Sequence, residues 1–130
     1  KVRLEQPRFR REVMRAYRKR CAVCALRRIE LIQAAHIVEF ASEGVNEVSN
    51  GVALCAIHHL AYDRNVMGID PTGVVHIARA VRLERDGPML REGLQAFHGQ
   101  RIRMPAQPTE RPAPDRLAIR FERFTEADAA

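Results

Sequence analysis

The first helical pattern of the chain lies near its start, in the segment PRFRREVMRAYRKR (residues 7–20). Its apolar positions are three or four residues apart, as on one face of a helix. They are Phe9, Val13, Ala16 and Tyr17. Pro7 suits a first turn, where the missing N–H has no partner to lose. We therefore predict a helix over residues 7–20 with one apolar and one basic face.

The middle of the chain reads as strand, loop and helix. Apolar, β-branched residues between Ile29 and Ile37 favour an extended segment. Residues 41–50, rich in Gly, Asn and Ser, predict a loop. From Val52 the apolar spacing becomes helical again, and Ser49 or Asn50 suits the N-cap of such a helix.

Turn residues divide the rest of the chain. Residues 67–84 predict a hairpin, because Asp-Pro-Thr-Gly separates two apolar runs. A short helix is expected between Pro88 and Gly99. Four prolines between residues 105 and 114 favour an extended strap, and residues 115–124 a last helix. The apolar residues expected to dock that helix are Leu117, Ile119, Phe121 and Phe124.

These elements, in a chain of 130 residues, predict one α+β domain with a core of modest size. We expect residues 1–104 to form its main unit and residues 105–130, the strap and last helix, to pack on it. Because the chain begins with Lys1, it is compatible with a fragment of a longer protein. No signal peptide or long apolar run appears, so we expect a cytoplasmic protein without membrane contact.

Positive charge is concentrated at the N-terminus. The whole chain carries a formal net charge of +6. Residues 1–20 contain nine Lys and Arg side chains and two Glu side chains, a local charge of +7. The other residues together are close to neutral. Such a segment suits contact with nucleic-acid phosphates, although a solvated helix face is the simpler alternative. The candidate phosphate-contacting residues are Arg8, Arg11, Arg15, Arg18 and Lys19, with Arg64 further along the chain.

Two cysteine-containing pairs have the spacing of zinc ligands. Cys21 and Cys24 form a C-x-x-C pair, and Cys55 and His58 form a C-x-x-H pair further on. Together they offer the four sulfur and nitrogen ligands of a closed tetrahedral site. Free thiols or a redox pair are the alternatives. We expect a structural Zn²⁺ that stabilises the fold and has no open position for chemistry.

His59 follows the last of these ligands directly and needs a separate explanation. On a helix, successive residues turn by about 100°, so His58 and His59 point in different directions. His59 and Asp63 are four residues apart and share a face. That spacing lets two side chains bind one cation, but it also occurs in surface hydrogen bonds.

Further residues connect His59 with a known family. His36, Asn50 and His59, interleaved with the two cysteine-containing pairs, resemble the motif of the HNH endonucleases. The segments CAVC, AAHI, SNGVALCAIHHLAYD, GID and GPMLREGLQAFHGQRIRMP are similar to the HNH domain of bacterial restriction endonucleases, some of which carry a reader of modified DNA. The resemblance covers roughly residues 9–105. It implies a ββα-metal core with a structural zinc, flanking helices and a hairpin.

The resemblance also implies roles. His36 would be the general base that takes a proton from the attacking water, a task that suits imidazole. Asn50 would hold the loop and orient that base. His59 would bind a catalytic divalent cation. Asp63, one turn further along the helix, is our own candidate for a second ligand, and magnesium or manganese suits a site with oxygen ligands and open positions.

One position departs from the family pattern. Many members carry an Asp or His ligand directly before the general base, where this chain has Ala35. Either His59, Asp63 and substrate oxygens complete the site, or His36 itself binds the ion. A binding-only copy is a third alternative.

The sequence thus predicts a metal-dependent DNA endonuclease, with DNA as its partner and specificity supplied by a reader domain outside this chain. Cutting both strands would suit a homodimer. The alternatives are a non-catalytic zinc-containing DNA-binding module and a zinc-stabilised protein-interaction domain.

Overall fold

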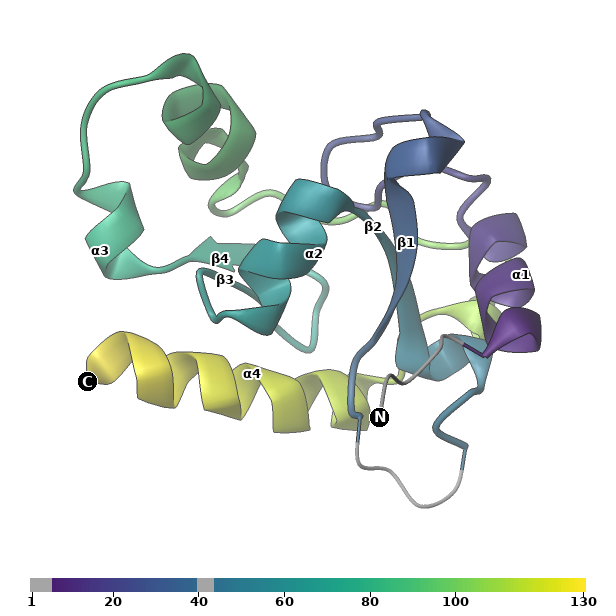
Figure 1. Ribbon diagram of the computed structural model, residues 1–130. Helices are drawn as coiled ribbons and strands as arrows, with labels where there is room; N and C mark the ends of the chain where they lie inside the picture. The colour runs from purple at the N-terminus through teal and green to yellow at the C-terminus, as the bar shows by residue number, and fades with distance from the viewer. Residues whose placement is uncertain (1–5, 40–43) are drawn as a thin grey trace, which may run out of the picture.

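An antiparallel hairpin followed by a helix forms the centre of the molecule. The computed structural model describes residues 6–39 and 44–130. Strand β1 (Ile32–His36) pairs with β2 (Gly51–Cys55), and α2 (Ala56–Asp63) follows without a loop. The hairpin lies between α1 (Pro7–Ala16) and α2, both of which contact its two strands (Figure 1). This is a ββα unit flanked by an additional helix.

A second, smaller hairpin joins this unit to the C-terminal helix. It consists of β3 (Met67–Ile69) and β4 (Val75–Ile77), and α4 (Pro114–Ala129) packs against β3. Gly68 allows this contact, because a Cβ there would lie 2.5 Å from the ring of Phe124. The C-terminal helix is therefore packed directly on the hairpin that follows α2.

Short helical turns make up the remaining regular structure. Beside α3 (Arg79–Arg82) they are η1 (Ile29–Leu31), η2 (Val48–Asn50), η3 (Met89–Leu94), η4 (Gln95–Phe97) and η5 (Pro108–Glu110). The proline-rich strap runs back over the first hairpin: Arg103 N–H donates to Ala22 O at 2.8 Å, and Ala113 N–H donates to Ser49 O at 2.9 Å. These bonds tie the strap to the turn after α1 and to η2, which directly precedes β2.

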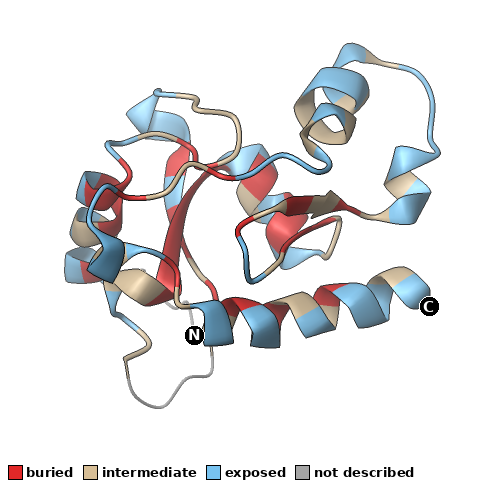
Figure 2. Cartoon of the chain, turned by 180° about the vertical axis from the view of Figure 1, so that it is seen from behind, coloured by how far each residue is buried: buried red, intermediate tan, exposed pale blue. Residues whose placement is uncertain are grey.

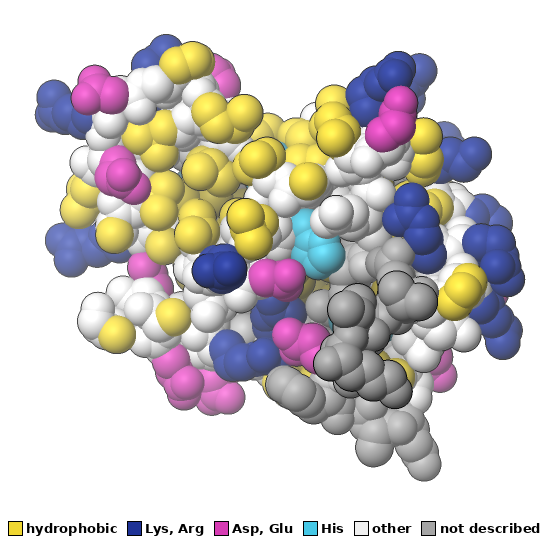
Figure 3. Space-filling model, viewed as in Figure 1, with side chains coloured by type: hydrophobic (Ala, Val, Ile, Leu, Met, Phe, Trp, Pro, Cys, Tyr) yellow, Lys and Arg dark blue, Asp and Glu magenta, His cyan; other side chains and the backbone are white. Residues whose placement is uncertain are grey.

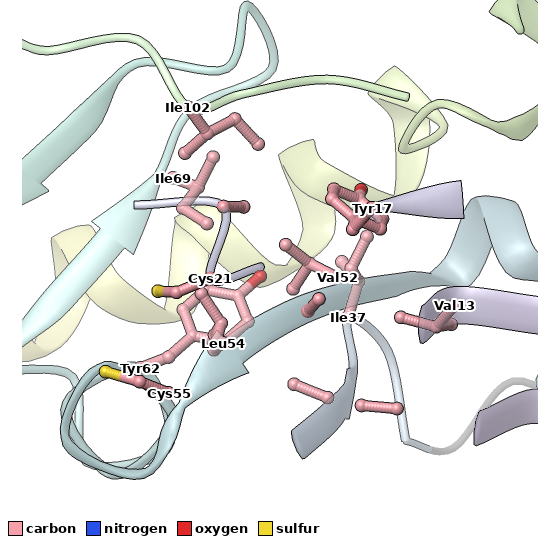
Figure 4. Packing of buried hydrophobic residues seen from close by; sticks show 14 of the residues in the cluster. Val13, Tyr17, Cys21, Ile37, Val52, Leu54, Cys55, Tyr62, Ile69 and Ile102 are labelled. Carbon is pink, nitrogen blue, oxygen red and sulfur yellow. The ribbon is translucent and has the colours of Figure 1, made fainter. Parts of the chain in front are cut away.

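One hydrophobic cluster holds these parts together. Buried residues lie along the first hairpin, on the inner side of α1 and on the side of α4 that faces the small hairpin (Figure 2). Side chains from α1, both hairpins, α2 and the strap converge in this cluster (Figure 4). Its largest fully buried members include Phe9, Leu54 and Tyr62. The α+β fold class expected from the sequence is confirmed.

The first helix is shorter than predicted. It ends at Ala16 rather than residue 20, because Tyr17 caps it and the next two residues turn left-handed. Arg18 has φ 57° and Lys19 φ 56°. Of the basic N-terminal segment, Lys1 and Arg3 lie outside the described residues, as do Phe40 and residues 41–43 of the predicted loop.

The helix predicted from Val52 is wrong in its first turn. Residues 51–55 form β2, all five are buried, and α2 begins at Ala56. A strand covered on both faces shows no alternation, so its apolar run resembles a buried helix. The cap is not Ser49 or Asn50 but Cys55, whose Sγ accepts a hydrogen bond from His58 N at 3.4 Å.

The second half of the chain follows its predicted order with shifted bounds. The 67–84 hairpin is present, but its second strand ends at Ile77 and gives way to α3. The last helix extends to Ala129, five residues beyond the predicted end. Leu117 and Phe124 are buried as expected, whereas Ile119 is 53% exposed, so its predicted docking role is wrong. Within the described residues, no helix is long and apolar enough to cross a membrane.

Candidate metal centre and active site

The four predicted zinc ligands converge at the junction of β2 and α2. The Sγ atoms of Cys21, Cys24 and Cys55 and a ring nitrogen of His58 all lie within 4.8 Å of one another. No disulfide joins the three cysteines. Two of them come from the turn after α1, and the other two ligands come from the start of α2. The cluster thus connects segments that lie more than thirty residues apart in the sequence.

The spacing of these atoms fits a tetrahedral zinc. Ligands about 2.0–2.3 Å from a central ion stand roughly 3.5–3.8 Å apart at tetrahedral angles. Here Nδ1 of His58 lies 3.6 Å from Cys21 Sγ and 3.3 Å from Cys55 Sγ, and the sulfurs of Cys24 and Cys55 are 3.9 Å apart. Three thiols and one imidazole are also a usual donor set for structural zinc. The cluster could therefore hold a zinc ion.

His58 is held in the orientation that this role requires. Its Nε2–H donates to Gly93 O at 2.7 Å, which leaves Nδ1 facing the three sulfurs. Burial alone would lower the pKa of His58, but hydrogen bonds with Cys21 and Cys55 raise it to about 10. Hydrogen bonds from Cys24 and Cys55 lower the pKa of the Cys21 thiol. A zinc ion bound here would take the place of the protons on the thiols and on Nδ1 of His58.

His59 points away from this cluster, toward β1. Its Nδ1 lies 2.6 Å from Gln33 Oε1, and its Nε2 lies 3.4 Å from Asp63 Oδ2. Because an amide oxygen only accepts, Gln33 fixes the proton on Nδ1 and leaves Nε2 toward the carboxylate. The side chains of His59 and Asp63 are 24% and 47% exposed. Unlike the buried cysteine cluster, this pair is open to solvent on one side.

His36 ends β1 on the side of the sheet that faces α1. Its ring stacks on Phe9 with centroids 4.0 Å apart and planes 3° from parallel. Its Nε2 lies 3.0 Å from Asn46 Oδ1. Side chains alternate along a strand, so Gln33 and Ala35 face α2 whereas His36 faces α1. In the described parts of the chain, no hydrogen bond or ion pair joins His36 to His59 or Asp63.

Asn50 is completely buried and holds the loop between the two strands. Its Oδ1 accepts from Val38 N at 3.1 Å, and its Nδ2 donates to Val38 O at 3.0 Å and Val45 O at 2.9 Å. Its own carbonyl oxygen accepts from Ile37 N at 2.8 Å. These bonds fix both ends of the loop that carries Asn46, the partner of His36.

Arg120 of α4 connects the ends of β1 and α2. Its guanidinium donates to Ile37 O at 2.8 Å and Tyr62 O at 3.0 Å, and it lies 3.4 Å from Asp63 Oδ1. It also stacks over the ring of Tyr62, 4.0 Å from its centroid. Only 4% of the side chain is exposed. One buried cation therefore bridges the strand that ends in His36 and the helix that carries His59.

The basic residues expected to contact DNA divide into two groups. Arg8 pairs with Glu12, and Arg15 pairs with Glu110. Arg11, Arg18, Lys19 and Arg64 are exposed and form no ion pair with a residue that the structure describes. On the face seen in Figure 3, Lys and Arg side chains gather over the α1 side of the molecule. Histidine and acidic side chains lie beside one another nearer the centre of the same face.

The sequence alone did not reveal Gln33, Asn46 and Arg120 as parts of this site. Gln33 could have been found, because it stands two residues before Ala35, the position of a metal ligand in many family members. In a strand, residues two positions apart point to the same face. Asn46 lies in a loop whose path no local pattern predicts. Arg120 is remote in sequence, and nothing in a helix of mixed polarity marks it as buried.

Comparison with known proteins agrees with this geometry. Residues 21–70 match the sequence model of an HNH endonuclease family, a range that contains both histidine sites and all four cluster residues. Among solved structures, the fold is similar to one described as "Modification dependent TagI restriction endonuclease", with a TM-score of 0.61 and 16% sequence identity. The similarity covers 93% of this chain but 39% of that one. A comparison with curated proteins finds no match.

Proposed function

We propose, because residues 21–70 match the sequence model of an HNH endonuclease family, that the chain hydrolyses DNA phosphodiester bonds with the help of a divalent cation. The family match and the ββα core support nuclease function. The observation that carries the finer proposal is the separation of the adjacent histidines. His58 completes the buried cysteine cluster, while His59 faces Asp63 on the exposed side.

The exposed pair suits a hard divalent cation. It offers one nitrogen, from His59, and one carboxylate oxygen, from Asp63, with room for water and substrate oxygens. The two atoms, His59 Nε2 and Asp63 Oδ2, lie 3.4 Å apart, so one cation could be bound by both. Such an ion, magnesium or manganese, would neutralise charge on the scissile phosphate and the leaving oxygen. Ala35 is buried and offers no ligand, so His59 and Asp63 are the protein ligands that we propose.

His36 is our candidate for the general base. Asn46 Oδ1 accepts from Nε2–H, which leaves the lone pair on Nδ1 to take the proton of an attacking water. The parallel stack on Phe9 and the bond to Asn46 prevent the ring from turning. Asn50 then acts through the loop, because its three side-chain hydrogen bonds hold the segment on which Asn46 lies.

Specificity is proposed to come from outside this chain. The similar solved structure is described as modification-dependent, and this chain corresponds to 39% of its length. We infer a role as the cleavage domain of a restriction-type enzyme, with a reader domain for modified DNA in a longer protein. Cleavage of both strands would bring two copies together on the DNA.

A plasmid assay tests this proposal against its alternatives. Supercoiled plasmid is incubated with magnesium or manganese and either the parent protein or His36→Ala, with zinc content confirming that both are folded. Cleavage by the parent alone supports the nuclease. Binding without cleavage by either would instead indicate a non-catalytic DNA-binding module. Neither binding nor cleavage would indicate a zinc-stabilised protein-interaction domain.

A further inference from the structure

Five basic side chains surround one surface pocket beside the cysteine cluster. The pocket has a volume of about 360 Å³. Its lining residues are Arg18, Lys19, Arg20, Arg27 and Arg103. We call this pocket the arginine cradle. Only Arg18 and Lys19 were expected from the sequence to contact DNA, so the site as a whole is new.

The cradle carries positive charge without a counter-charge. In the parts of the chain that the structure describes, none of its five side chains forms an ion pair. Arg20 instead lies close enough to Arg27, Arg103 and Arg18 to be repelled by them. Neighbouring Arg28, by contrast, is paired with Glu30 at 3.0 Å. Gathering like charges is unfavourable unless an anion binds between them.

The cradle is built by ordered backbone rather than by flexible side chains alone. Arg18 and Lys19 occupy a left-handed turn, with φ 57° and 56°, in which Lys19 N–H bonds Met14 O at 2.8 Å. Such conformations are uncommon for residues other than glycine and often occur at functional sites. On the opposite side, Arg103 is fixed because its N–H bonds Ala22 O at 2.8 Å. Three separate segments are thus held around one space.

A groove along α1 adjoins the cradle and shares Arg18 and Lys19 with it. It has a volume of about 780 Å³, and its other lining residues are Arg10, Arg11 and Arg15 with Glu12, Met14 and Ile29. At the other end of the helix, Phe9 stacks on His36.

We propose that the arginine cradle binds a backbone phosphate of duplex DNA other than the phosphate that is cut. Guanidinium groups suit this task because each can donate two parallel hydrogen bonds to one phosphate. The contact provides affinity and register but reads no base. This inference rests on the proposed function, since it takes duplex DNA as the substrate.

Two double variants with the same change in charge test the cradle. Arg27→Gln/Arg103→Gln removes two cradle residues. Arg28→Gln/Arg101→Gln is the control, because these two arginines lie near the cradle residues in the sequence but do not line the cradle. Arg28 pairs with Glu30, and Arg101 donates to Thr72 O. Binding to a fluorescent duplex is measured by anisotropy at several salt concentrations without added divalent cation. Because cleavage is not needed, a protein that binds but never cuts would contradict the proposed function and not the cradle.

The cradle predicts a difference in salt dependence between the two pairs. Each lost phosphate contact lowers the slope of log K against log salt by about 0.9. We expect the cradle variant to lose about one to two units of slope and roughly tenfold or more in affinity at low salt, and the neighbour variant to lose far less. Equal changes in both pairs, or no binding by the parent protein, would overturn the proposal.

A third variant distinguishes the loss of a phosphate contact from a folding defect. Arg18→Gln/Lys19→Gln alters the cradle from a different segment, and zinc content and melting temperature confirm that each protein is folded. The slope should fall in this variant as well. An unchanged slope in it would also overturn the proposal, because the left-handed turn would then have no part in binding.

Discussion

The guanidinium of Arg120 lies 3.4 Å from the carboxylate of Asp63, in contact with a helix that carries both candidate metal ligands. The same group donates to the carbonyl oxygen of Ile37, directly after His36. Arg120 lies outside the residues that match the family. The C-terminal helix is therefore joined to the candidate active site by a buried side chain.

Replacing Arg120 should destabilise the protein. Arg120→Met would take from Ile37 O its donor in a buried setting, and would remove one of two donors to Tyr62 O, which also accepts from Asn65 N–H. An unsatisfied buried group costs about 1–3 kcal/mol, so we expect the free energy of unfolding to fall by about 2 kcal/mol. Urea unfolding followed by circular dichroism measures this change.

Arg123→Met is the matched control. Arg123 lies one turn further along α4, is 39% exposed and forms one ion pair with Glu39 at 2.9 Å. Such a pair contributes less than about 1 kcal/mol. Similar losses in the two variants would show that Arg120 does not have the bridging role described above.

Gln33 should matter for cleavage rather than for folding. Gln33→Leu removes the acceptor that orients His59, and loss of such a supporting bond typically lowers metal affinity or activity about 10–100-fold. Gln33→Glu keeps an acceptor oxygen and should retain most activity. Rates of plasmid cleavage at several magnesium concentrations measure the effect. Full activity of Gln33→Leu would refute the orienting role.

The two asparagines of the β1–β2 loop should behave differently. Asn46→Ala removes one bond to His36 at the surface, so we expect at least a tenfold slower cleavage with little change in stability. Asn50→Ala removes three bonds in a buried position and should lower the free energy of unfolding by about 2–4 kcal/mol. Thermal unfolding together with cleavage rates separates the two. Equal stability losses would contradict the assignment.

Asp70 should make stability depend on pH in the acidic range. Burial alone would raise its pKa, but hydrogen bonds from Thr72, His76 and Val74 lower it to about 2. A lowered carboxyl pKa stabilises the fold above the unfolded pKa of about 4, and this contribution is lost as the pH falls toward 2.

Asp70→Asn removes the charge and keeps an acceptor oxygen. The parent should therefore lose about 1 kcal/mol more stability than Asp70→Asn between pH 4 and pH 2, the effect being reduced because the side chain still meets solvent. Urea unfolding at pH 4, 3 and 2 tests this. Parallel curves for the two proteins would contradict it, and the exposed Asp115→Asn serves as a control.

Ligand spacing and turn chemistry were visible in the sequence because they are local. The two cysteine-containing pairs predicted the cluster, and Asp-Pro-Thr-Gly predicted the small hairpin. The resemblance of His36, Asn50 and His59 to a motif predicted the ββα core. These signals depend either on residues a few positions apart or on the spacing of residues in a known motif.

The sequence-based predictions were wrong where tertiary packing determines the secondary structure or the burial of a residue. Val52 and Leu54 looked helical because β2 is covered on both faces, which only the position of α1 explains. Arg18 and Lys19 ended the helix early through a left-handed turn that no common propensity favours. The burial of Arg120 follows from how α4 lies against the hairpins, and its own sequence gives no sign of it.

The central claim is that the adjacent histidines, His58 and His59, serve two different sites. Native mass spectrometry of the parent, His59→Ala and Cys21→Ala measures it most directly, by counting zinc ions per chain. We predict one zinc in the parent and in His59→Ala, and a lost or much reduced zinc in Cys21→Ala. Equal loss of zinc in His59→Ala and Cys21→Ala would contradict the separation of the two sites.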